Sequence, residues 1–584
     1  MIEDRLLCES LERWAATRPD TDAHSFLEFD RRAARRDVVS YLELDVWSRA
    51  IAAHLGDYGR RGDRAAILAP PGLSYIAAFL GVLRSPLVGV PLFAPGLPGH
   101  VDRLEQSIAD CQPSVLLTVA DERLAVGELV RALDGVAEAP IVAVDQLRGA
   151  SGSADAARYV RPTLCPSDLA YLQYTSGSTR APAGVMLTHE NVMSNTRQLV
   201  AAFGPHVGPT DAQAGVSWLP MFHDMGLILG LAMPLVTGCT GVTFDPIAFI
   251  QRPRRWLEAL SGWDRAYSAA PNFAFGLVAK RVRDEDLESV NLRGVEAILN
   301  GAEPVTLPAM SAFAERLAPC GLRATALRPA YGLAEATVFV ATTEPGTPPR
   351  GLRVDAMALQ GNRLEPASDG APAIEIVAHG GPWGQEIIIV DPETHQMLDT
   401  GEIGEIWVRG SNVGVGYWAN PETTTATFDA EPADARPPLE GSWLRTGDLG
   451  AQLDGQLYIT GRRKDLIVLD GRNIYPHDVE HTVEESHPAI AAHRSAAFGV
   501  ADPAGAEAMV VVAERHREAA TDEAALDEAR TAAVGAIVKN HAVSVHEVLI
   551  VEPHSIPRTS SGKVARGAAR QAYIDGTFHA ALTT

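Results

Sequence analysis

Short runs rich in valine, isoleucine and leucine alternate along the chain with stretches that have helical spacing. Residues 64–69 form such a run, and residues 73–83 follow it with the pattern of a helix. Residues 115–119 and 141–144 read as further buried strands. Strands that alternate with helices in this way are typical of parallel sheets covered by helices. We therefore predict an α/β fold for this part of the chain.

The pattern changes farther along the chain. Residues 385–409 contain Ile/Val runs separated by Glu-containing turns, which indicates a smaller β-rich unit. Beyond this unit we expect a second domain, with a strand at 466–469 and a helix at 476–485. The sequence thus predicts a large N-terminal domain over residues 1–462 and a small, mobile α+β domain over residues 463–584.

Two other segments carry predictions of their own. Residues 515–534 are rich in Ala, Glu and Asp, which predicts a helix with a solvated face. Residues 225–244 carry no charge and are long enough to span a bilayer. This second segment contains Pro234 and four glycines, so we predict a buried helix that leads into a buried strand, without integral membrane association.

Composition narrows the possible functions. At 584 residues the chain is too long for a single hydrophobic core. Its formal net charge of −23 argues against nonspecific nucleic-acid binding, which needs a basic surface. Five cysteines lie far apart without a Cys-x-x-Cys pair, which fits neither a disulfide framework nor a zinc site. The first residues lack the form of a secretory signal, so we expect a cytoplasmic protein.

The first candidate for chemistry follows the apolar run that begins at Tyr171. This run ends in a stretch of hydroxyl residues and glycine, made of Thr175, Ser176, Gly177, Ser178 and Thr179. Glycine lets the backbone approach an anion, and a turn with inward N–H groups makes an anion-binding nest. The spacing is not that of a Walker A loop. The stretch predicts a phosphate-binding loop, and an ordinary surface turn is the alternative.

Six further motifs follow in order along the chain. They are Trp218-Leu-Pro-Met-Phe-His-Asp-Met-Gly226, Asn300-Gly-Ala-Glu-Pro304, Arg328-Pro-Ala-Tyr-Gly-Leu-Ala-Glu335, Leu444-Arg-Thr-Gly-Asp448, Gly461-Arg-Arg-Lys-Asp465 and Pro557-Arg-Thr-Ser-Ser-Gly-Lys563. In this order they resemble the core motifs of the adenylate-forming enzymes, which include acyl-CoA synthetases, peptide-synthetase adenylation domains and luciferases. The resemblance covers nearly the whole chain and implies that ATP activates a carboxylate.

One departure from the superfamily pattern points to a particular branch. The phosphate loop usually contains a lysine where this chain has Ala183, and Arg180 precedes it. Together with segments 268–273 and 471–473, this resembles the fatty acyl-AMP ligases. Those enzymes stop at the acyl-adenylate or pass the acyl group to a carrier protein, and they do not favour coenzyme A. The branch also carries an insertion, for which residues 354–377 are the candidate and an ordinary variable loop is the alternative.

The resemblance implies roles for residues that would bind ATP. Lys563 would reach the carboxylate and the α-phosphate during adenylation. Glu335 would bind Mg²⁺, which proteins usually hold with one or two carboxylates plus nucleotide oxygens. Asp448 would accept hydrogen bonds from both ribose hydroxyls, with Arg462 as its cationic neighbour. Arg180 would replace part of the charge that the loop lacks.

The adenine is expected to lie against the ring of Tyr331. The other adenine-binding residues implied by the motifs are Gly301, Ala302, Glu303, Ala330 and Gly332. His223 would lie at the mouth of an acyl pocket, although a core histidine bonded to a neighbour is the alternative. The apolar wall of that pocket would consist of Trp218, Met221, Phe222, Met225 and Phe273. Such residues also form ordinary cores, and the sequence leaves both possibilities open.

The resemblance places a hinge at Lys464, about which the small domain would rotate between adenylation and acyl transfer. No Asp-Ser-Leu phosphopantetheine site follows Lys563, so we expect an acyl carrier protein to act in trans. Carrier proteins are usually acidic and would dock on a basic patch. One candidate patch is Arg558, Lys563, Arg566 and Arg570, and another is Arg31, Arg32, Arg35 and Arg36.

Three other functions compete with a fatty acyl-AMP ligase. A medium- or long-chain acyl-CoA synthetase differs by its dependence on coenzyme A. An amino-acid adenylation domain usually has an aspartate just ahead of the helix that residues 271–275 begin here, and this chain has none there. A catalytically silent acyl- or nucleotide-binding protein is conceivable without the loop lysine. Against it stand Glu335, Asp448, Arg462 and Lys563, all of which are present.

Overall fold

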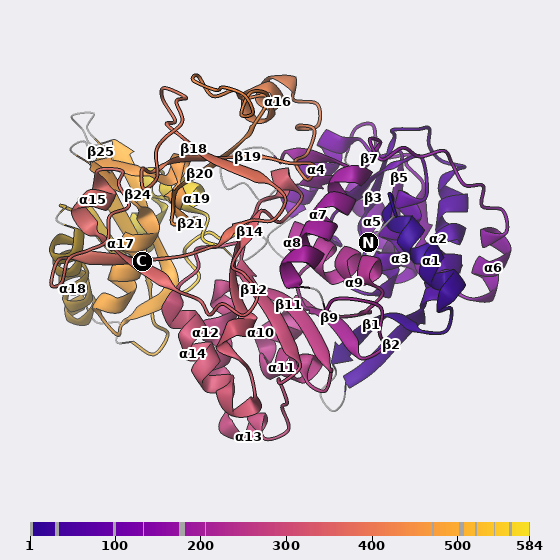
Figure 1. Ribbon diagram of the computed structural model, residues 1–584, viewed down its shortest axis with the longest axis horizontal. Helices are drawn as coiled ribbons and strands as arrows, with labels where there is room; N and C mark the ends of the chain where they lie inside the picture. The colour runs from indigo at the N-terminus through magenta and orange to yellow at the C-terminus, as the bar shows by residue number, and fades with distance from the viewer. Residues whose placement is uncertain are drawn as a thin grey trace.

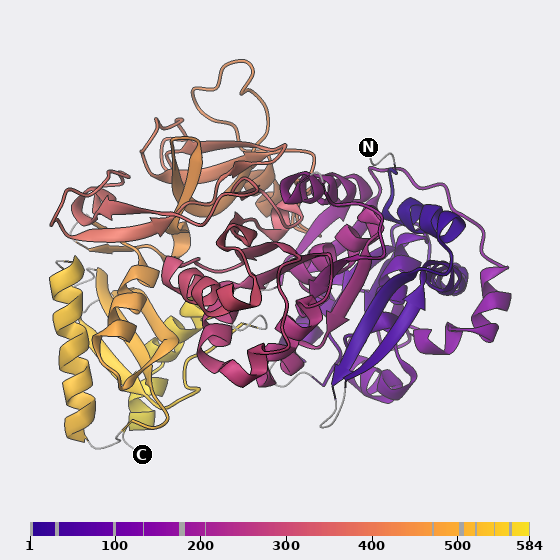
Figure 2. The same cartoon turned by 60° about the horizontal axis from the view of Figure 1, so that its bottom comes forward.

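The computed structural model describes residues 4–29, 34–96, 101–131, 133–174, 182–204, 206–469, 472–501, 507–519, 523–541, 543–559 and 563–582. In Figure 1 the N-terminal half lies on the right, the β-rich unit at the top and the C-terminal residues on the left. Figure 2 shows the same arrangement from below, with the yellow C-terminal helices at the opposite end from the indigo N-terminal half.

Two mainly parallel sheets form the centre of the large domain. In the six-stranded sheet only β7 and β8 pair antiparallel, and in the nine-stranded sheet antiparallel pairs occur only toward the edges. The first sheet has the order β6 (Ile141–Ala143), β5 (Val115–Thr118), β3 (Arg64–Ile67), β4 (Val88–Pro91), β7 (Leu169–Tyr174), β8 (Gly184–Thr188). The second has the order β17 (Gly381–Pro382), β14 (Ala341–Thr342), β13 (Leu327–Tyr331), β12 (Val295–Gly301), β11 (Arg265–Pro271), β9 (Gln213–Ser217), β10 (Thr240–Phe244), β1 (Asp22–Phe29), β2 (Ala34–Ser40). The predicted α/β fold with parallel sheets is confirmed.

Helices α2 (Tyr41–Leu55) and α3 (Leu73–Leu83) pack against each other and against strands of both sheets. Helix α2 begins with a capping box, in which Ser40 and Glu43 exchange side-chain to backbone hydrogen bonds of 3.1 and 3.2 Å. One continuous hydrophobic core includes residues of both sheets. Further helices of the large domain include α1 (Leu7–Thr17), α4 (Val101–Cys111), α5 (Arg123–Val130), α6 (Ala150–Ala156), α7 (His189–Phe203), α10 (Pro246–Gln251), α11 (Arg254–Leu260), α12 (Asn272–Arg281), α13 (Asp284–Leu287) and α14 (Leu307–Leu317).

The predicted β-rich unit is an antiparallel sheet. It contains β18 (Glu386–Val390), β19 (Gly404–Arg409), β20 (Leu444–Leu453) and β21 (Gln456–Arg462), with α16 (Pro421–Phe428) between the second and third strands. The prediction for residues 385–409 is confirmed, and the later strands β20 and β21 complete the sheet. These two strands matter most for the site, because they carry Asp448 and Arg462 as directly paired residues.

The small domain has its own hydrophobic clusters, which begin at Ile467. The predicted strand near 466–469 and the helix near 476–485 are both present. Strand β25 continues to Arg515 and the next helix begins only at Glu523, so the predicted helix at 515–534 is wrong at its start. Residues 507–515 pair with strands on both sides, which composition alone did not indicate. The elements are β22 (Ile467–Leu469), β23 (Arg472–Ile474), α17 (Pro476–Ser486), β24 (Ile490–Ala501), β25 (Glu507–Arg515), α18 (Glu523–His541), β26 (Glu547–Val551), α19 (Arg566–Ile574) and α20 (Thr577–Leu582).

The uncharged segment 225–244 is a broken helix followed by a strand, as predicted. It consists of α8 (Asp224–Leu227), a π-helical turn (Ile228–Ala232), α9 (Met233–Thr237) and β10. All its residues are buried. Among the residues that the structure describes, no helix has the length and apolar character needed to cross a membrane.

Residues 354–377 form a regular unit rather than an irregular loop. Strands β15 (Gly351–Asp355) and β16 (Ala373–Val377) pair antiparallel, with the short helix α15 (Ala356–Gln360) after β15. The side chain of Gln360 donates a 2.9 Å hydrogen bond to the carbonyl of His541 in the small domain. The unit also shares a hydrophobic cluster with Leu449 and Tyr458 of the β-rich sheet, so it packs against both domains, and its assignment as a branch-specific insertion stays a prediction.

Candidate functional site

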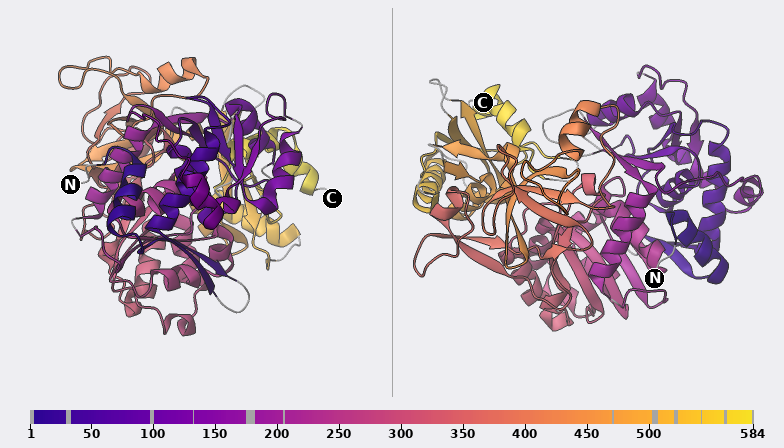
Figure 3. Two further views of the ribbon diagram at one scale, coloured as in Figure 1. Left: turned by 90° about the vertical axis from the view of Figure 1, so that its right-hand side faces the viewer. Right: turned by 45° about the horizontal axis from the view of Figure 1, so that its top comes forward.

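A cavity of about 1900 Å³ lies where the large domain, the β-rich unit and the small domain meet. Strands β12 and β13 end at this cavity, and the segment after β11 also lines it. Because the carboxyl ends of parallel strands meet at one edge of a sheet, residues from distant motifs come together there. Figure 3 shows the β-rich unit and the small domain beside this edge of the large domain.

The predicted ribose site is a connected group of three side chains. The hydroxyl of Tyr331 donates a 2.9 Å hydrogen bond to one oxygen of Asp448. The guanidinium of Arg462 lies 3.2 Å from the other oxygen of the same carboxylate. Asp448 is buried, whereas half of the Arg462 side chain is exposed. The Asp448 carboxylate raises the pKa of Arg462, so this guanidinium stays protonated.

The turn that presents Asp448 is held by a buried ion pair. Gly447 has a φ of 70°, a conformation that favours glycine. The carboxylate of Glu405 accepts the Gly447 N–H at 3.1 Å, and Arg445 donates to the same carboxylate at 2.8 and 3.0 Å. Sequence reasoning missed both residues of this pair, although Arg445 stands inside the motif that ends at Asp448.

Glu335 is partly buried, and the hydroxyl of Tyr417 donates a 2.7 Å hydrogen bond to its carboxylate. Burial raises the pKa of Glu335, while the Tyr417 hydrogen bond opposes this shift. Among the described residues, no side chain forms an ion pair with Glu335 within 4.0 Å. A bound cation would compensate this charge, so the residue fits the predicted role in holding Mg²⁺.

The described part of the chain contains no group of three or more His, Cys, Asp or Glu side chains able to hold a metal ion by themselves. Glu335 would therefore need oxygens of a bound nucleotide to complete the coordination of Mg²⁺. This is the manner in which proteins usually bind that ion.

The backbone is tightly packed at two of the predicted adenine-binding residues, Gly301 and Gly332. A Cβ atom on Gly301 would lie 2.9 Å from the carbonyl oxygen of Ala330, and one on Gly332 would lie 1.7 Å from that of Val338. Larger residues therefore cannot replace these glycines without a shift of the backbone. Ala302 has a φ of 67°, which non-glycine residues rarely adopt.

Glu303 and Lys563 bring opposite charges into the same cavity. The carboxylate of Glu303 accepts the Phe273 N–H at 2.6 Å, a side-chain role that the sequence did not suggest. Burial and the neighbouring Arg462 lower the pKa of Lys563, while Asp224 and Glu303 oppose that shift. The charge of the predicted catalytic lysine thus interacts with acids of the large domain and with Arg462.

His223 lines the cavity and also has a protein partner, and its place at the mouth of an acyl pocket stays a prediction. Its Nδ1 lies 2.5 Å from the carboxylate of Asp224. Burial would raise the pKa of Asp224, but His223, the Met225 N–H and Lys563 together hold it below its ordinary value. The pair therefore places a charged carboxylate behind the imidazole at the start of α8.

Part of the cavity lining is apolar. Phe222, Met225 and Phe273 line the cavity as predicted. Trp218 and Met221 do not belong to the lining; they lie in the core behind it. Trp218 stacks on Phe249 with ring centroids 3.9 Å apart, which explains its burial.

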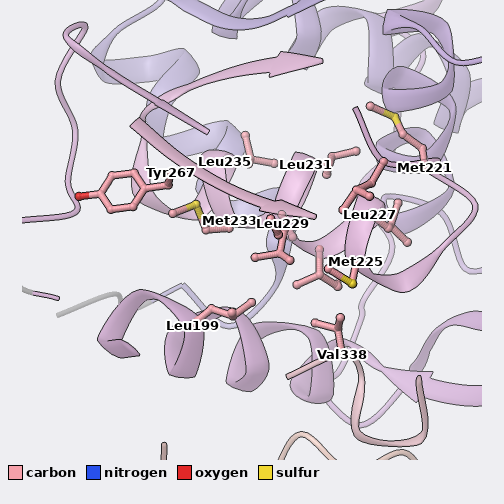
Figure 4. Close-up of a cluster of buried hydrophobic side chains, with 14 of the residues drawn as sticks. Leu199, Met221, Met225, Leu227, Leu229, Leu231, Met233, Leu235, Tyr267 and Val338 are labelled. Atoms are coloured by element: carbon pink, nitrogen blue, oxygen red, sulfur yellow. The ribbon is translucent and has the colours of Figure 1, made fainter. Parts of the chain in front are cut away.

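Three further apolar residues, Leu199, Leu229 and Val338, line the cavity beside Met225. In Figure 4 these side chains gather on one side of the broken helix, and Met221 lies on the other. The i, i+4 spacing of Met225 and Leu229 would have indicated a shared helical face. Leu199 and Val338 come from other segments, and no local pattern links them to this helix.

The sequence as a whole matches known protein families. A family model described as "AMP-binding enzyme" matches residues 11–418, and one described as "Disco-interacting protein 2-like, AMP domain" matches residues 464–582. The long-chain-fatty-acid–AMP ligase FadD26 of Mycobacterium marinum is 41% identical, over 99% of each chain. The chain belongs to the AMP-binding enzymes, in their fatty acyl-AMP ligase branch.

Two other relatives of this branch are informative. The 4-hydroxyphenylalkanoate adenylyltransferase of Mycobacterium tuberculosis is 41% identical, over 99% of this chain and 93% of its own. A crystal structure of a fatty acyl-adenylate ligase from L. pneumophila in complex with acyl adenylate and pyrophosphate is 30% identical, with a TM-score of 0.74 over 98% of this chain and 97% of that one. Two relatives with the same sequence identity to this chain are thus named for different acids. Sequence identity alone therefore does not determine which acid an AMP-binding enzyme activates.

Part of the predicted ATP site lies outside the described residues. This applies to Thr175, Ser176, Gly177, Ser178, Thr179 and Arg180, and likewise to Arg31 and Arg32 of one basic patch. Ala183, which stands where AMP-binding enzymes usually have the loop lysine, lines the cavity. Lys464, the predicted hinge residue, is exposed in the short turn Arg463–Asp465 between β21 and β22.

In the two predicted carrier-docking patches, most described cationic side chains pair with acids or line the central cavity. Arg566 pairs with Glu480 at 2.6 Å, and Arg558 and Lys563 line the central cavity. In the other patch Arg36 lies 3.1 Å from Asp22, and Arg35 lies 3.8 Å from Glu28. Among the described residues of the two patches, Arg35, Arg36 and Arg566 are thus paired with acids in this arrangement of the domains.

Proposed function

We propose that this protein activates a fatty acid with ATP to an acyl-adenylate, releases pyrophosphate, and then passes the acyl group to a carrier protein in lipid, polyketide or lipopeptide biosynthesis. The observation that carries the proposal is that Lys563, Glu335, Asp448 and Arg462 line one cavity whose lining also includes apolar side chains such as Met225 and Leu229. The similarity to a long-chain-fatty-acid–AMP ligase over the whole chain supports the same reaction.

In the first step an oxygen of the fatty-acid carboxylate attacks the α-phosphorus of ATP. The new oxygen–phosphorus bond forms while the bond to the β-phosphate oxygen breaks, and pyrophosphate leaves. Negative charge must be neutralised on both sides of the reacting phosphorus. Lys563 would supply a positive charge at the carboxylate and the α-phosphate. Mg²⁺, held by Glu335 when bound, would neutralise charge on the phosphates.

The nucleoside part of ATP would be oriented by residues that are already fixed by each other. Asp448 is held by Tyr331, Arg462 and the turn at Gly447, so its carboxylate is available to the ribose hydroxyls in a defined direction. Such preorganisation lowers the entropy cost of placing the α-phosphorus next to the carboxylate.

The second step needs a different face of the small domain. We place the hinge at Lys464 and the boundary of the domains near residue 462, since the hydrophobic clusters of the small domain begin at Ile467. Rotation there would withdraw Lys563 and admit the phosphopantetheine arm of a carrier protein. We place the reaction in the cytoplasm, where ATP and carrier proteins are both available.

The proposal is tested by supplying purified acyl-AMP to the protein with either a phosphopantetheinylated acyl carrier protein or coenzyme A. The proposed function predicts transfer to the carrier protein and little acyl-CoA. Rapid acyl-CoA formation would instead identify an acyl-CoA synthetase. Failure to consume acyl-AMP with either acceptor would contradict the transfer step.

A further inference from the structure

Arg566 begins helix α19, and each of its three guanidinium nitrogens donates a hydrogen bond to a carboxylate. Nε and Nη2 donate to the two oxygens of Glu480, each at 2.6 Å. Nη1 donates to Asp465 at 3.2 Å. Two parallel hydrogen bonds to one carboxylate fix the direction of an arginine as well as its position. These donors of Arg566 are thus engaged by groups of the protein rather than by a substrate.

This group of three charges is largely shielded from solvent. The side chains of Arg566, Glu480 and Asp465 are 21%, 11% and 16% exposed. Burial would lower the pKa of Arg566, but Glu480 and Asp465 raise it, so the guanidinium stays protonated. Loss of one partner from such a group leaves a partly buried charge uncompensated, which costs more than the loss of an exposed ion pair.

Arg566 stands at the base of the turn that carries Lys563. The two arms of this turn are joined by backbone hydrogen bonds. The Thr559 N–H donates to the carbonyl of Lys563 at 2.8 Å, and the Ala565 N–H donates to the carbonyl of Pro557 at 2.9 Å. Ala565 is buried, and Arg566 follows it directly. The ion pairs of Arg566 therefore anchor this turn.

The two carboxylates belong to different elements of the small domain. Glu480 lies on α17, and Asp465 directly follows Lys464 in the short turn between β21 and β22. Arg463, on the other side of Lys464, lies 2.7 Å from the carboxylate of Glu393 in the large domain. A rotation at Lys464 would thus carry Asp465 with the small domain and leave Arg463 with the large one.

From these contacts we propose that Arg566 is a positioning residue for Lys563. It joins the base of the Lys563 turn to Asp465 and to α17, so that this turn and the end of the hinge move as one body. The proposal rests on the proposed function, because it concerns the step in which Lys563 acts. Without these ion pairs the hinge would close but leave Lys563 out of place, and a displacement of about 1 Å can lower a rate about a hundredfold.

The two half-reactions separate this role from a general loss of stability. Arg566→Lys keeps a positive charge but loses the paired hydrogen bonds to Glu480, and Asp465→Asn removes only the charge beside the hinge. The kcat of acyl-AMP formation should fall about ten- to a hundredfold in Arg566→Lys and about fivefold in Asp465→Asn, with unchanged KM values for ATP and fatty acid. Transfer from supplied acyl-AMP to a carrier protein, in which Lys563 takes no part, should keep its rate. Equal losses in both half-reactions would overturn the proposal.

A Lys563→Ala background tests whether Arg566 acts through Lys563. In this background Arg566→Lys should cause no further loss of acyl-AMP formation, because the group that it would displace is already gone. A further loss as large as that in the unchanged background would overturn the proposal.

Arg84→Lys is the matched control. Arg84 is a buried arginine of the large domain that lies 2.5 Å from Asp45 and 3.1 Å from Glu12, and it stands outside the lining of the cavity. This variant should lower the Tm and change both half-reactions by the same factor. A selective loss of acyl-AMP formation in Arg84→Lys would overturn the proposal, because that loss would then follow from any weakened buried ion pair.

Hydrogen exchange gives a readout that needs no catalysis. The N–H groups of Thr559 and Ala565 should exchange about tenfold faster in Arg566→Lys and in Asp465→Asn, and at the unchanged rate in Arg84→Lys. Unchanged exchange in both Arg566→Lys and Asp465→Asn would overturn the proposal. If the unchanged protein formed no acyl-AMP, the proposed function would fail, and hydrogen exchange would still decide whether Arg566 holds the turn.

Discussion

The hydroxyl of Tyr417 donates a 2.7 Å hydrogen bond to the carboxylate of Glu335, although the two residues stand 82 positions apart in the chain. Glu335 follows the last parallel strand of the nine-stranded sheet, and Tyr417 lies beyond the β19 strand of the β-rich unit. This bond fixes the direction of the carboxylate proposed to hold Mg²⁺. The first prediction follows from it.

Glu335→Gln should raise the Mg²⁺ concentration needed for half-maximal pyrophosphate release, because the charged ligand is lost. Tyr417→Phe keeps the ligand and removes only its orienting partner, so a smaller increase of about tenfold is expected, the lower end of the range for such partners. Both are measured by titrating Mg²⁺ at fixed ATP. An unchanged Mg²⁺ dependence in Glu335→Gln would exclude this residue as the metal ligand.

Lys563→Ala should lower the kcat of acyl-AMP formation by about 10²- to 10³-fold, the usual effect of removing one group that stabilises transition-state charge. The affinity for ATP should change little, because Asp448 and Arg462 remain. Lys280→Ala, at the end of α12 and away from the cavity, is the control and should leave the rate unchanged. A Lys563→Ala protein with normal kcat would remove this lysine from the mechanism.

The pH profile of adenylation should report the same lysine. Burial and Arg462 lower the pKa of Lys563, so it loses its proton as pH rises through a value below that of an ordinary lysine. The rate should therefore fall on the alkaline side at a lower pH than an unperturbed lysine would give. The guanidinium of Lys563→Arg stays protonated, so the activity of this variant should begin to fall only at a higher pH. If both proteins lost activity at the same alkaline pH, a group other than Lys563 would be responsible for the loss.

Asp448→Asn should weaken recognition of the ribose. Hydrogen bonds to a charged group contribute about 1.5–3 kcal/mol, so the KM for ATP should rise by roughly ten- to a hundredfold. The unchanged protein should also prefer ATP over 2′-deoxy-ATP, and the variant should lose much of that preference. If the variant discriminated between the two nucleotides as well as the unchanged protein, Asp448 would not contact the ribose.

Leu229→Phe should shift the preferred acyl chain toward shorter acids, since this side chain lines the apolar side of the cavity. Leu231→Phe is the control, because Leu231 is buried two residues farther along the same helix but does not line the cavity. Overpacking costs about 1–3 kcal/mol, so the control should lower the Tm without moving the chain-length optimum. A panel of fatty acids from eight to eighteen carbons, compared by kcat/KM, separates the two.

Much of the fold followed from local patterns, because alternation of strands and helices and the composition of residues 385–409 are properties of short segments. The start of helix α18 could not be predicted in this way. Residue 515 still pairs with β24, and the His516 N–H donates a 2.6 Å hydrogen bond to the carbonyl of Ala489, which are long-range contacts that local composition does not carry.

For the candidate site as well, local motifs predicted some features, and long-range packing determined the others. Motifs gave Lys563, Glu335, Asp448 and Arg462, and all four line the cavity. The motif that gave Phe222 and Met225 also gave Trp218 and Met221, whose side chains point into the core. A motif fixes which residues are near each other in the chain, but side-chain direction is set by packing, as the stacking of Trp218 on Phe249 illustrates. Glu303 and Tyr417 acquire their contacts at the site only because distant segments come together.

The most direct test of the proposed activity is fatty-acid-dependent exchange of labelled pyrophosphate into ATP, measured without coenzyme A. The account predicts exchange that requires dodecanoic acid or a similar fatty acid, requires Mg²⁺, proceeds without coenzyme A and is lost in Lys563→Ala. Absence of exchange with every fatty acid, or exchange that continues in Lys563→Ala at the normal rate, would contradict it.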